Sequence, residues 1–195
     1  MANKLKKEFH AFLLSDYEKE EEYLRKMHNK GYKLVKVKLP GFYYFEKCEP
    51  EDVVYRLDFN PQKITDKQNY LQMYEDYGWE YMQDLNEFSY FRKASNNVDD
   101  KDIEIFSDSE SRLDMMKRII TKRMIPLMII FLLCVLPQII NMIDIIYENL
   151  YSPFNIFSVV FCILWIMIFI MYLCMFVHCG KGFYKLKKKY SNKND

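Results

Sequence analysis

The sequence has few of the residues from which common catalytic sites are built. It contains 5 glycines and 3 histidines among 195 residues, and it has no glycine-rich phosphate loop, no H-E-x-x-H motif and no paired cysteines at zinc-ligand spacing. Its 28 basic and 27 acidic residues nearly cancel, whereas direct nucleic-acid binding favours a strongly basic surface. We therefore expect no enzyme activity, no catalytic residue, no metal, no cofactor and no nucleic-acid partner.

The sequence also lacks the features of a secreted, disulfide-bonded protein. Three of its five cysteines, Cys134, Cys162 and Cys174, lie inside long apolar runs, which argues against a disulfide framework. The N-terminus has no apolar core of signal-peptide length and no small-residue cleavage site. We interpret the short apolar stretch from Glu8 to Leu14 as a first strand.

Two long apolar runs are present instead, at residues 124–143 and 154–177, and neither contains a charged side chain. At 1.5 Å per helical residue, each is long enough to cross roughly 30 Å of hydrocarbon. They predict a transmembrane hairpin over residues 124–178, with the lipid bilayer as a partner. Gln138 and Asn141 in the first run are either helix-packing residues or part of a site, because amides in hydrocarbon seek partners.

Basic residues flank the hairpin on both outer sides, whereas the connection at residues 144–153 contains none. By the positive-inside rule this pattern predicts two spans in a bacterial inner (cell) membrane, with both termini in the cytoplasm. The flanking basic residues are Lys117, Arg118, Lys122, Arg123, Lys181, Lys185, Lys187, Lys188 and Lys189.

Residues 1–93 repeat themselves at a spacing of about 47 residues: Tyr23, Leu24 and Gly31 recur as Tyr70, Leu71 and Gly78. Each half reads as strand, helix, strand, strand. We therefore predict an α+β cytoplasmic domain made of a duplicated βαββ unit, with one sheet and two helices on one face. The expected strands are residues 8–14, 32–38, 42–47, 53–58, 79–84 and 87–93.

Both expected helices have start and stop signals. Ser15 with Glu18, and Thr65 with Gln68, have capping-box spacing. Gly31 and Gly78 suit the left-handed position that ends a helix. Successive helical side chains point in different directions, so we expect the glutamates to form a solvated first turn. These are Glu18, Glu20, Glu21 and Glu22.

The remaining segments follow from composition. Residues 94–110 are polar and acidic and are predicted to be a linker. Residues 111–123 combine an apolar stripe with basic side chains, which favours a juxtamembrane helix near anionic headgroups. Residues 179–195 are predicted to form a basic cytoplasmic tail.

The candidate ligand or partner surface is the groove between the two repeats. Phe42 and Tyr44 alternate with Tyr43 and Phe45, so one pair faces the core and the other pair faces outward. Both pairs are apolar enough for a core, and our hypothesis places Tyr43 outward. The proposed surface consists of Tyr43, Trp79, Tyr81 and Glu46, where the carboxylate attracts a cationic amphiphile. The alternative is that these side chains pack the domain or meet its own membrane surface.

Several short motifs in the first half resemble those of the bacterial family called domain of unknown function 2812. They are F-H-A-F at residues 9–12, M-x-x-K-G-Y at 27–32, Y-F-E-K at 44–47, Y-R-L-D at 55–58 and Y-G-W-E at 77–80. The resemblance implies a small membrane-anchored protein without an assigned activity, often encoded beside PadR-type regulators. The duplicated topology is also similar to that of GyrI-like effector-binding domains, a likeness of fold only.

Together, these features predict a membrane-tethered cytoplasmic binding or sensor module in a regulatory or stress-response circuit. The expected partner is a hydrophobic small molecule or another protein. The alternative is an accessory or structural membrane subunit that docks a partner such as a transporter. Identification of whatever co-purifies from native membrane distinguishes a small-molecule sensor from an adaptor.

Overall fold

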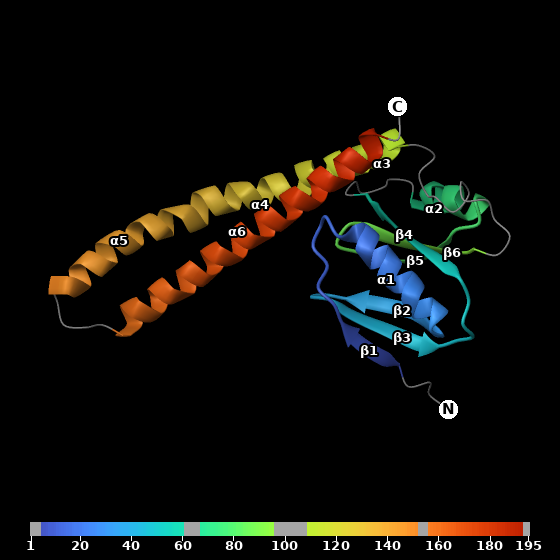
Figure 1. Ribbon diagram of the computed structural model, residues 1–195, viewed down its shortest axis with the longest axis horizontal. Coiled ribbons are helices and arrows are strands. Elements are labelled where there is room, and N and C mark those ends of the chain that lie inside the picture. The colour runs from blue at the N-terminus through green and yellow to red at the C-terminus, as the bar shows by residue number, and fades with distance from the viewer. Residues whose placement is uncertain (1–4, 61–66, 96–108, 152–155, 193–195) are drawn as a thin grey trace.

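The computed structural model describes residues 5–60, 67–95, 109–151 and 156–192. It consists of an α+β head and a long helical hairpin (Figure 1). The elements of the head, in chain order, are β1 (Lys6–Phe9), α1 (Tyr17–Asn29), β2 (Tyr32–Lys38), β3 (Phe42–Lys47), β4 (Val53–Phe59), α2 (Lys67–Asp76), β5 (Glu80–Leu85) and β6 (Phe88–Ala94). The expected α+β class and strand–helix–strand–strand order are confirmed.

The six strands form two antiparallel sheets, in the orders β1-β3-β2 and β4-β6-β5. The expectation of one continuous sheet is therefore wrong. Strand β2 has a register irregularity between Leu34 and Lys36, and β5 has one between Tyr81 and Gln83. Such bulges interrupt the regular edge that continuous pairing requires. A side chain joins the sheets instead: the Gln83 amide accepts from the Val37 N–H at 3.0 Å and donates to the Val37 carbonyl at 3.2 Å.

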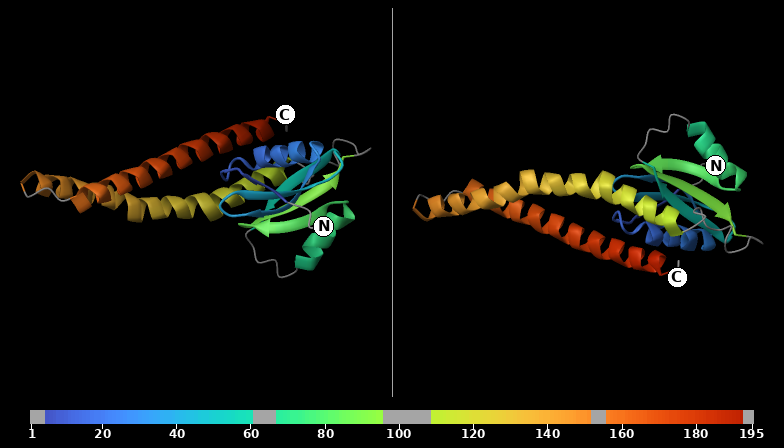
Figure 2. Two further views of the ribbon diagram at one scale, coloured as in Figure 1. Left: turned by 90° about the horizontal axis from the view of Figure 1, so that it is seen from below. Right: turned by 90° about the horizontal axis from the view of Figure 1, so that it is seen from above.

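Helices α1 and α2 lie on opposite sides of the strands (Figure 2), which corrects the expectation that both cover one face. On α1, Leu24 and Met27 pack into the main core with strands of both sheets. Tyr74 of α2 packs on the other side of the second sheet, against Trp79 and Phe91. The second sheet is therefore packed on both faces, whereas none of the described helices covers the outer face of the first sheet.

Local signals at the helix ends are confirmed in part. Gly31 and Gly78 have φ values of +80° and +77°, as expected for residues that close a helix in the left-handed conformation. The N-cap of α1 is Asp16 and has no side-chain capping bond, so the capping box expected at Ser15 does not form. The second box, at Thr65, lies outside the described residues.

The hairpin comprises α3 (Ser109–Ile119), η1 (Ile120–Met124), α4 (Ile125–Ile130), η2 (Phe131–Val135), α5 (Leu136–Tyr151) and α6 (Ile156–Ser191). Segments η1 and η2 are π-helical and each ends two residues before a proline, Pro126 or Pro137. Proline has no N–H for the usual helical bond, which favours such a local change of winding.

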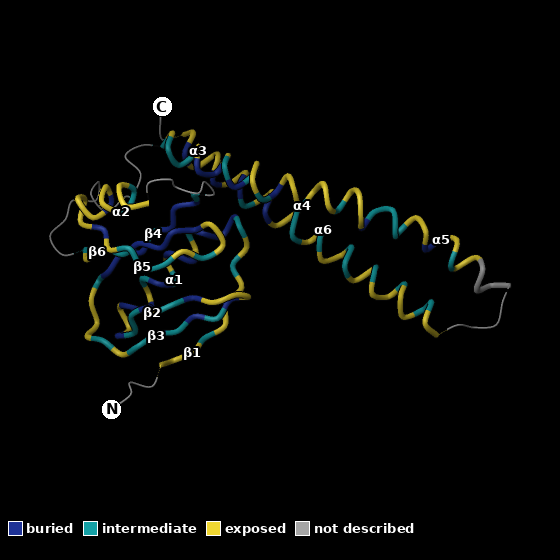
Figure 3. The backbone as a smooth tube through the Cα atoms, turned by 180° about the vertical axis from the view of Figure 1, so that it is seen from behind, coloured by how far each residue is buried: buried dark blue, intermediate teal, exposed yellow. Residues whose placement is uncertain are grey.

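Both arms of the hairpin are long and apolar enough to cross a membrane. Only 11% of the most apolar stretch of the first arm is buried, and 0% of that of the second arm. Exposed apolar helices of this length indicate a membrane protein with two spans. Beyond the spans, the two arms join the head (Figure 3). Met115 and Ile119 of α3, with Phe183 and Leu186 of α6, are buried in the main core. The segments expected to be a headgroup-bound helix and a basic tail thus pack against the head.

Candidate functional site

The head has two strand–helix–strand–strand units, residues 6–47 and residues 53–94. A cavity of about 90 Å³ is lined by residues of both units. Three pieces of chain surround it: the segment before α1 and its first turns, the β2–β3 turn, and the β5–β6 turn with β6. The two hairpins turn at the same end of the head, and this brings side chains of both units around one space.

Three polar side chains converge at this cavity. The hydroxyls of Tyr43 on β3 and Tyr90 on β6 both donate to Oε1 of Glu20 on α1, each at 2.6 Å. All three residues line the cavity, and Glu20 is only 7% exposed. Among the described residues, no basic side chain forms an ion pair with Glu20. The carboxyl is therefore solvated by two tyrosines, one from each unit, and lacks a counter-charge.

Burial controls the protonation of this cluster. It raises the pKa of the Glu20 carboxyl, and the two hydroxyl bonds oppose the shift without cancelling it. Burial and the nearby Glu20 also raise the pKa of Tyr43 and Tyr90. The tyrosines therefore remain donors, and Glu20 holds its proton more strongly than a solvated glutamate does.

The β2–β3 and β5–β6 turns that line the cavity lie at the end of the head from which the hairpin extends (Figure 1). Arg123, at the start of the first apolar run, donates to the Asn86 side chain at 2.7 Å. His178, at the end of the second run, contacts Asp16 at 2.8 Å. These contacts place the β5–β6 turn and the start of α1 beside the ends of the two apolar runs that are nearest to the head. Leu39, at the rim of the cavity, is 65% exposed.

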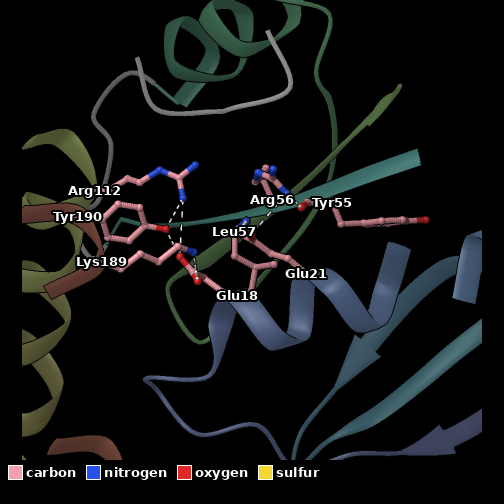
Figure 4. Close-up of polar contacts among 8 residues, drawn as sticks. All are labelled: Glu18, Glu21, Tyr55, Arg56, Leu57, Arg112, Lys189 and Tyr190. Atoms are coloured by element: carbon pink, nitrogen blue, oxygen red, sulfur yellow. Dashed lines mark hydrogen bonds and ion pairs between the residues drawn. The ribbon is translucent and has the colours of Figure 1, made fainter. Parts of the chain in front are cut away.

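Helix α1 also carries a second buried carboxyl (Figure 4). Glu21 accepts from the backbone N–H of Leu57 at 2.9 Å and lies 3.5 Å from the Arg56 guanidinium. Because β4 is at the edge of its sheet among the described strands, this bond satisfies an N–H that none of those strands pairs. Burial raises the pKa of Glu21 to about 7, although Arg56 and the Leu57 bond act in the opposite direction.

The start of α1 is tied to both arms of the hairpin. Glu18 accepts from the Tyr190 hydroxyl, and it pairs with Lys189 at 2.8 Å and Arg112 at 3.8 Å. Arg112 of α3 donates to the Tyr190 hydroxyl of α6 at 2.7 Å. Figure 4 shows these side chains meeting at one place. Helix α1 therefore contacts the cavity through Glu20 and the hairpin through Glu18.

The structure separates the four residues of the expected surface. Tyr43 is 3% exposed, so the hypothesis that it faces outward is wrong; its alternate neighbours Phe42 and Tyr44 lie on the outer face. Trp79 is buried beneath α2 and Tyr81 packs beside it. Glu46 pairs with Lys33 at 2.6 Å. Of these residues, Tyr43 alone lines the cavity between the units.

Sequence reasoning missed Glu20, Glu21 and Tyr90. The glutamates were expected to form a solvated turn, but Glu20 and Glu21 are buried. A signal was present, because both fall on one helical stripe with Tyr17 and Leu24, at the i, i+3, i+4 and i+7 spacing of a buried face. Carboxylates on such a stripe indicate that strands packed against it supply hydrogen-bond donors.

The fold and the hairpin define a class: an α+β head joined to two candidate membrane spans. A model of the family described as protein of unknown function (DUF2812) matches residues 16–130, which is more than half of the chain. The chain belongs to this family. Comparisons with curated proteins and with solved structures gave no match.

Proposed function

We propose that the protein is a membrane-tethered binding module whose recognition site is the cavity between its two units. The observation that carries the proposal is the Glu20 carboxyl, which is buried, held by hydroxyls from both units and has no basic partner among the described residues. A buried carboxylate without a counter-charge is costly. A ligand with a positive group supplies that charge.

The size of the cavity limits what enters it. The cavity volume of about 90 Å³ is far below the roughly 300–1,000 Å³ typical of sites for whole drug-sized molecules. It accommodates roughly three water-sized groups. Only a headgroup and its first methylenes fit. Because the rim includes exposed Leu13 and Leu39 beside the apolar runs, the rest of the ligand is apolar and extends toward the bilayer. We therefore assign the ligand class as an amphiphile with a protonated amine.

Helix α1 supports a sensing role. A cation that bonds to Glu20 changes the hydrogen bonds of α1 with Tyr43 and Tyr90, and the same helix pairs with α3 and α6 through Glu18. Occupancy of the cavity thus biases the contact between the head and the membrane arms. Such a coupling suits a regulatory or stress-response circuit, including one that contains a PadR-type regulator.

The test uses the full-length protein in nanodiscs with three probes of equal chain length: octylamine, octanol and octanoate. We expect octylamine to bind and to raise the unfolding temperature, and the other two to do neither. Glu20→Gln keeps an oxygen acceptor for both tyrosines but removes the charge. We therefore expect the variant to bind octylamine more weakly by a factor of at least roughly ten. Binding should also release protons from Glu20, seen as a buffer-dependent enthalpy.

Glu46→Gln is the matched control, because it removes a carboxylate that lies outside the cavity and pairs with Lys33. It should bind octylamine as the wild type does. Equal binding of the three probes, or unchanged binding by Glu20→Gln, would overturn the proposal.

We also propose that the head lies in the cytoplasm, with both termini on that side of the inner membrane. The basic residues next to the two apolar runs support this orientation. We propose further that the two units are copies of one ancestral unit. Their shared strand order, the 47-residue spacing of Gly31 and Gly78, and the matching irregularities in β2 and β5 support duplication.

A second candidate function is docking of a protein partner, as in an accessory membrane subunit. The outer face of the first sheet favours it, because Lys7 lies over the Phe42 ring at 3.9 Å and Phe9 is well exposed. Replacing Phe9 with Ser should then remove a specific co-purifying protein while leaving octylamine binding unchanged.

A further inference from the structure

A second site lies on the other side of the α1 start, where α6 emerges from the second apolar run. A groove of about 370 Å³ is bounded there by residues before and within the first turn of α1 and by one side of α6. The residues that matter for its chemistry are Ser15, His178, Lys181 and Lys185. We call it the Ser15 groove. It is separate from the cavity that contains Glu20.

The acidic side chains of the groove are already paired. Asp16 contacts Lys19 at 2.5 Å and His178 at 2.8 Å, and Glu18 pairs with Lys189. Lys181 and Lys185 are exposed, and no acidic partner is found for either of them within the described ranges. They are one helical turn apart, so both ammonium groups can reach the same bound group.

Ser15 provides an independent observation. Its hydroxyl is buried, and no hydrogen-bond partner is found for it in the described part of the chain. It sits against Gly182 of α6, where a Cβ would lie only 2.4 Å from the Ser15 Oγ. An unsatisfied buried hydroxyl is costly. Ser15 lines the groove, so an acceptor bound there would satisfy this hydroxyl.

The position of the groove identifies the source of that acceptor. His178 follows the second apolar run directly, and Lys181 comes three residues later, about 4.5 Å further along the helix. The headgroup layer on each side of a bilayer is of similar thickness. Lipid phosphates therefore lie beside these side chains, and lysines at this depth attract anionic lipids.

We propose that the Ser15 groove binds the phosphate group of an anionic phospholipid, with Lys181 and Lys185 supplying charge and Ser15 a hydroxyl donor. The lipid fixes the α1 start to α6 at the membrane surface. This contact lies next to the Asp16–His178 pair that already joins the two elements.

The test is native mass spectrometry of the full-length protein in detergent with phosphatidylglycerol, phosphatidylcholine or inorganic phosphate. We expect preferential retention of phosphatidylglycerol. Lys185→Gln should weaken it about fivefold, and Ser15→Ala should weaken it without a change of charge. The matched control is Lys187→Gln, which removes the same charge from a lysine of the same helix that does not line the groove; it should retain the lipid as the wild type does.

Thermal unfolding of each variant separates loss of binding from loss of folding. Equal weakening by Lys185→Gln and Lys187→Gln would mean diffuse surface charge and would overturn the site. Binding of inorganic phosphate without a preference for phosphatidylglycerol would overturn the assignment to a lipid. A Ser15→Ala protein that retains lipid as the wild type does would remove the hydroxyl from the proposal.

Discussion

Replacing Glu21 with Gln should stabilise the protein at alkaline pH. Gln keeps an oxygen that accepts from the Leu57 N–H, a bond of 2.9 Å in the structure, but it carries no charge to bury. Burial raises the pKa of Glu21 from 4.5 to about 7, and the nearby Arg56 and the Leu57 bond only partly oppose this effect.

The raised pKa fixes the sign of the pH effect. Below pH 4.5 both the folded and the unfolded chain hold the proton, so the contribution of Glu21 to stability is then fully present. Between pH 4.5 and 7 only the folded chain holds it, so the free energy of unfolding falls as pH rises. A shift of this size corresponds to on the order of 3 kcal/mol, of which about 2.5 kcal/mol is lost between pH 5 and pH 8. Gln does not titrate, so the variant escapes this loss.

The assay is thermal unfolding of the full-length protein in nanodiscs at pH 5 and pH 8. Trp79 is buried beneath α2 and reports on the head, and a Trp165→Phe background removes the other tryptophan. Relative to the wild type, Glu21→Gln should gain stability from pH 5 to pH 8. As a control, Glu22→Gln removes an exposed carboxylate whose pKa is lowered by Lys26, and it should show no such gain. If Glu21→Gln loses the same stability at both pH values, Glu21 is ionised in the fold and the reasoning fails.

Three further predictions concern the fold and topology. Gly31→Ala should destabilise the protein more than Gly78→Ala. Both substitutions cost roughly 1 kcal/mol because of the positive φ, but of the two positions only Gly31 would bring a Cβ to 2.9 Å from a backbone carbonyl, that of Cys48. Equal unfolding temperatures of the two variants would contradict this. Gln83→Ala should cost about 1–2 kcal/mol because two bonds to Val37 are lost, whereas the exposed Gln72→Ala should be near neutral in the same thermal assay. Reporter fusions at Met1, near Glu148 and after Asp195 should report cytoplasm, exterior and cytoplasm, and an external N-terminal head would refute the topology.

The sequence alone predicted the features that depend on near neighbours in the chain. Strands β2 and β3 match their expected ranges residue for residue, because the alternation of their side chains is a local pattern and Pro40 and Gly41 lie between the two strands. Gly31 and Gly78 have the expected positive φ, since a helix end needs that conformation whatever packs around it. The two apolar runs likewise predicted the candidate spans by length and composition.

The first strand was misplaced for a physical reason that involves distant residues. The apolar stretch to Leu14 suggested a strand over residues 8–14, but β1 covers only Lys6–Phe9 and pairs with β3. The backbone N–H of His10 donates instead to the Gly41 carbonyl. The apolar side chains that follow line the cavity between the units; they are Phe12, Leu13 and Leu14. Phe12 packs against Tyr23 of α1 and Tyr43 of β3, so this contact does not depend on a longer strand.

Tertiary structure alone decided which faces are buried and where the site lies. The alternation of side chains along a strand places Tyr43 and Tyr44 on opposite faces of the sheet, but it does not determine which of them faces α1. Helix α1 packs against strands of both sheets, and this buries Glu20 and Glu21, because those strands supply the tyrosine hydroxyls and the edge N–H that these carboxyls require. The cluster is completed by Tyr43 and Tyr90, which lie 23 and 70 positions from Glu20 in the sequence. No local pattern contains that information, since it depends on how the two units and the membrane arms pack together.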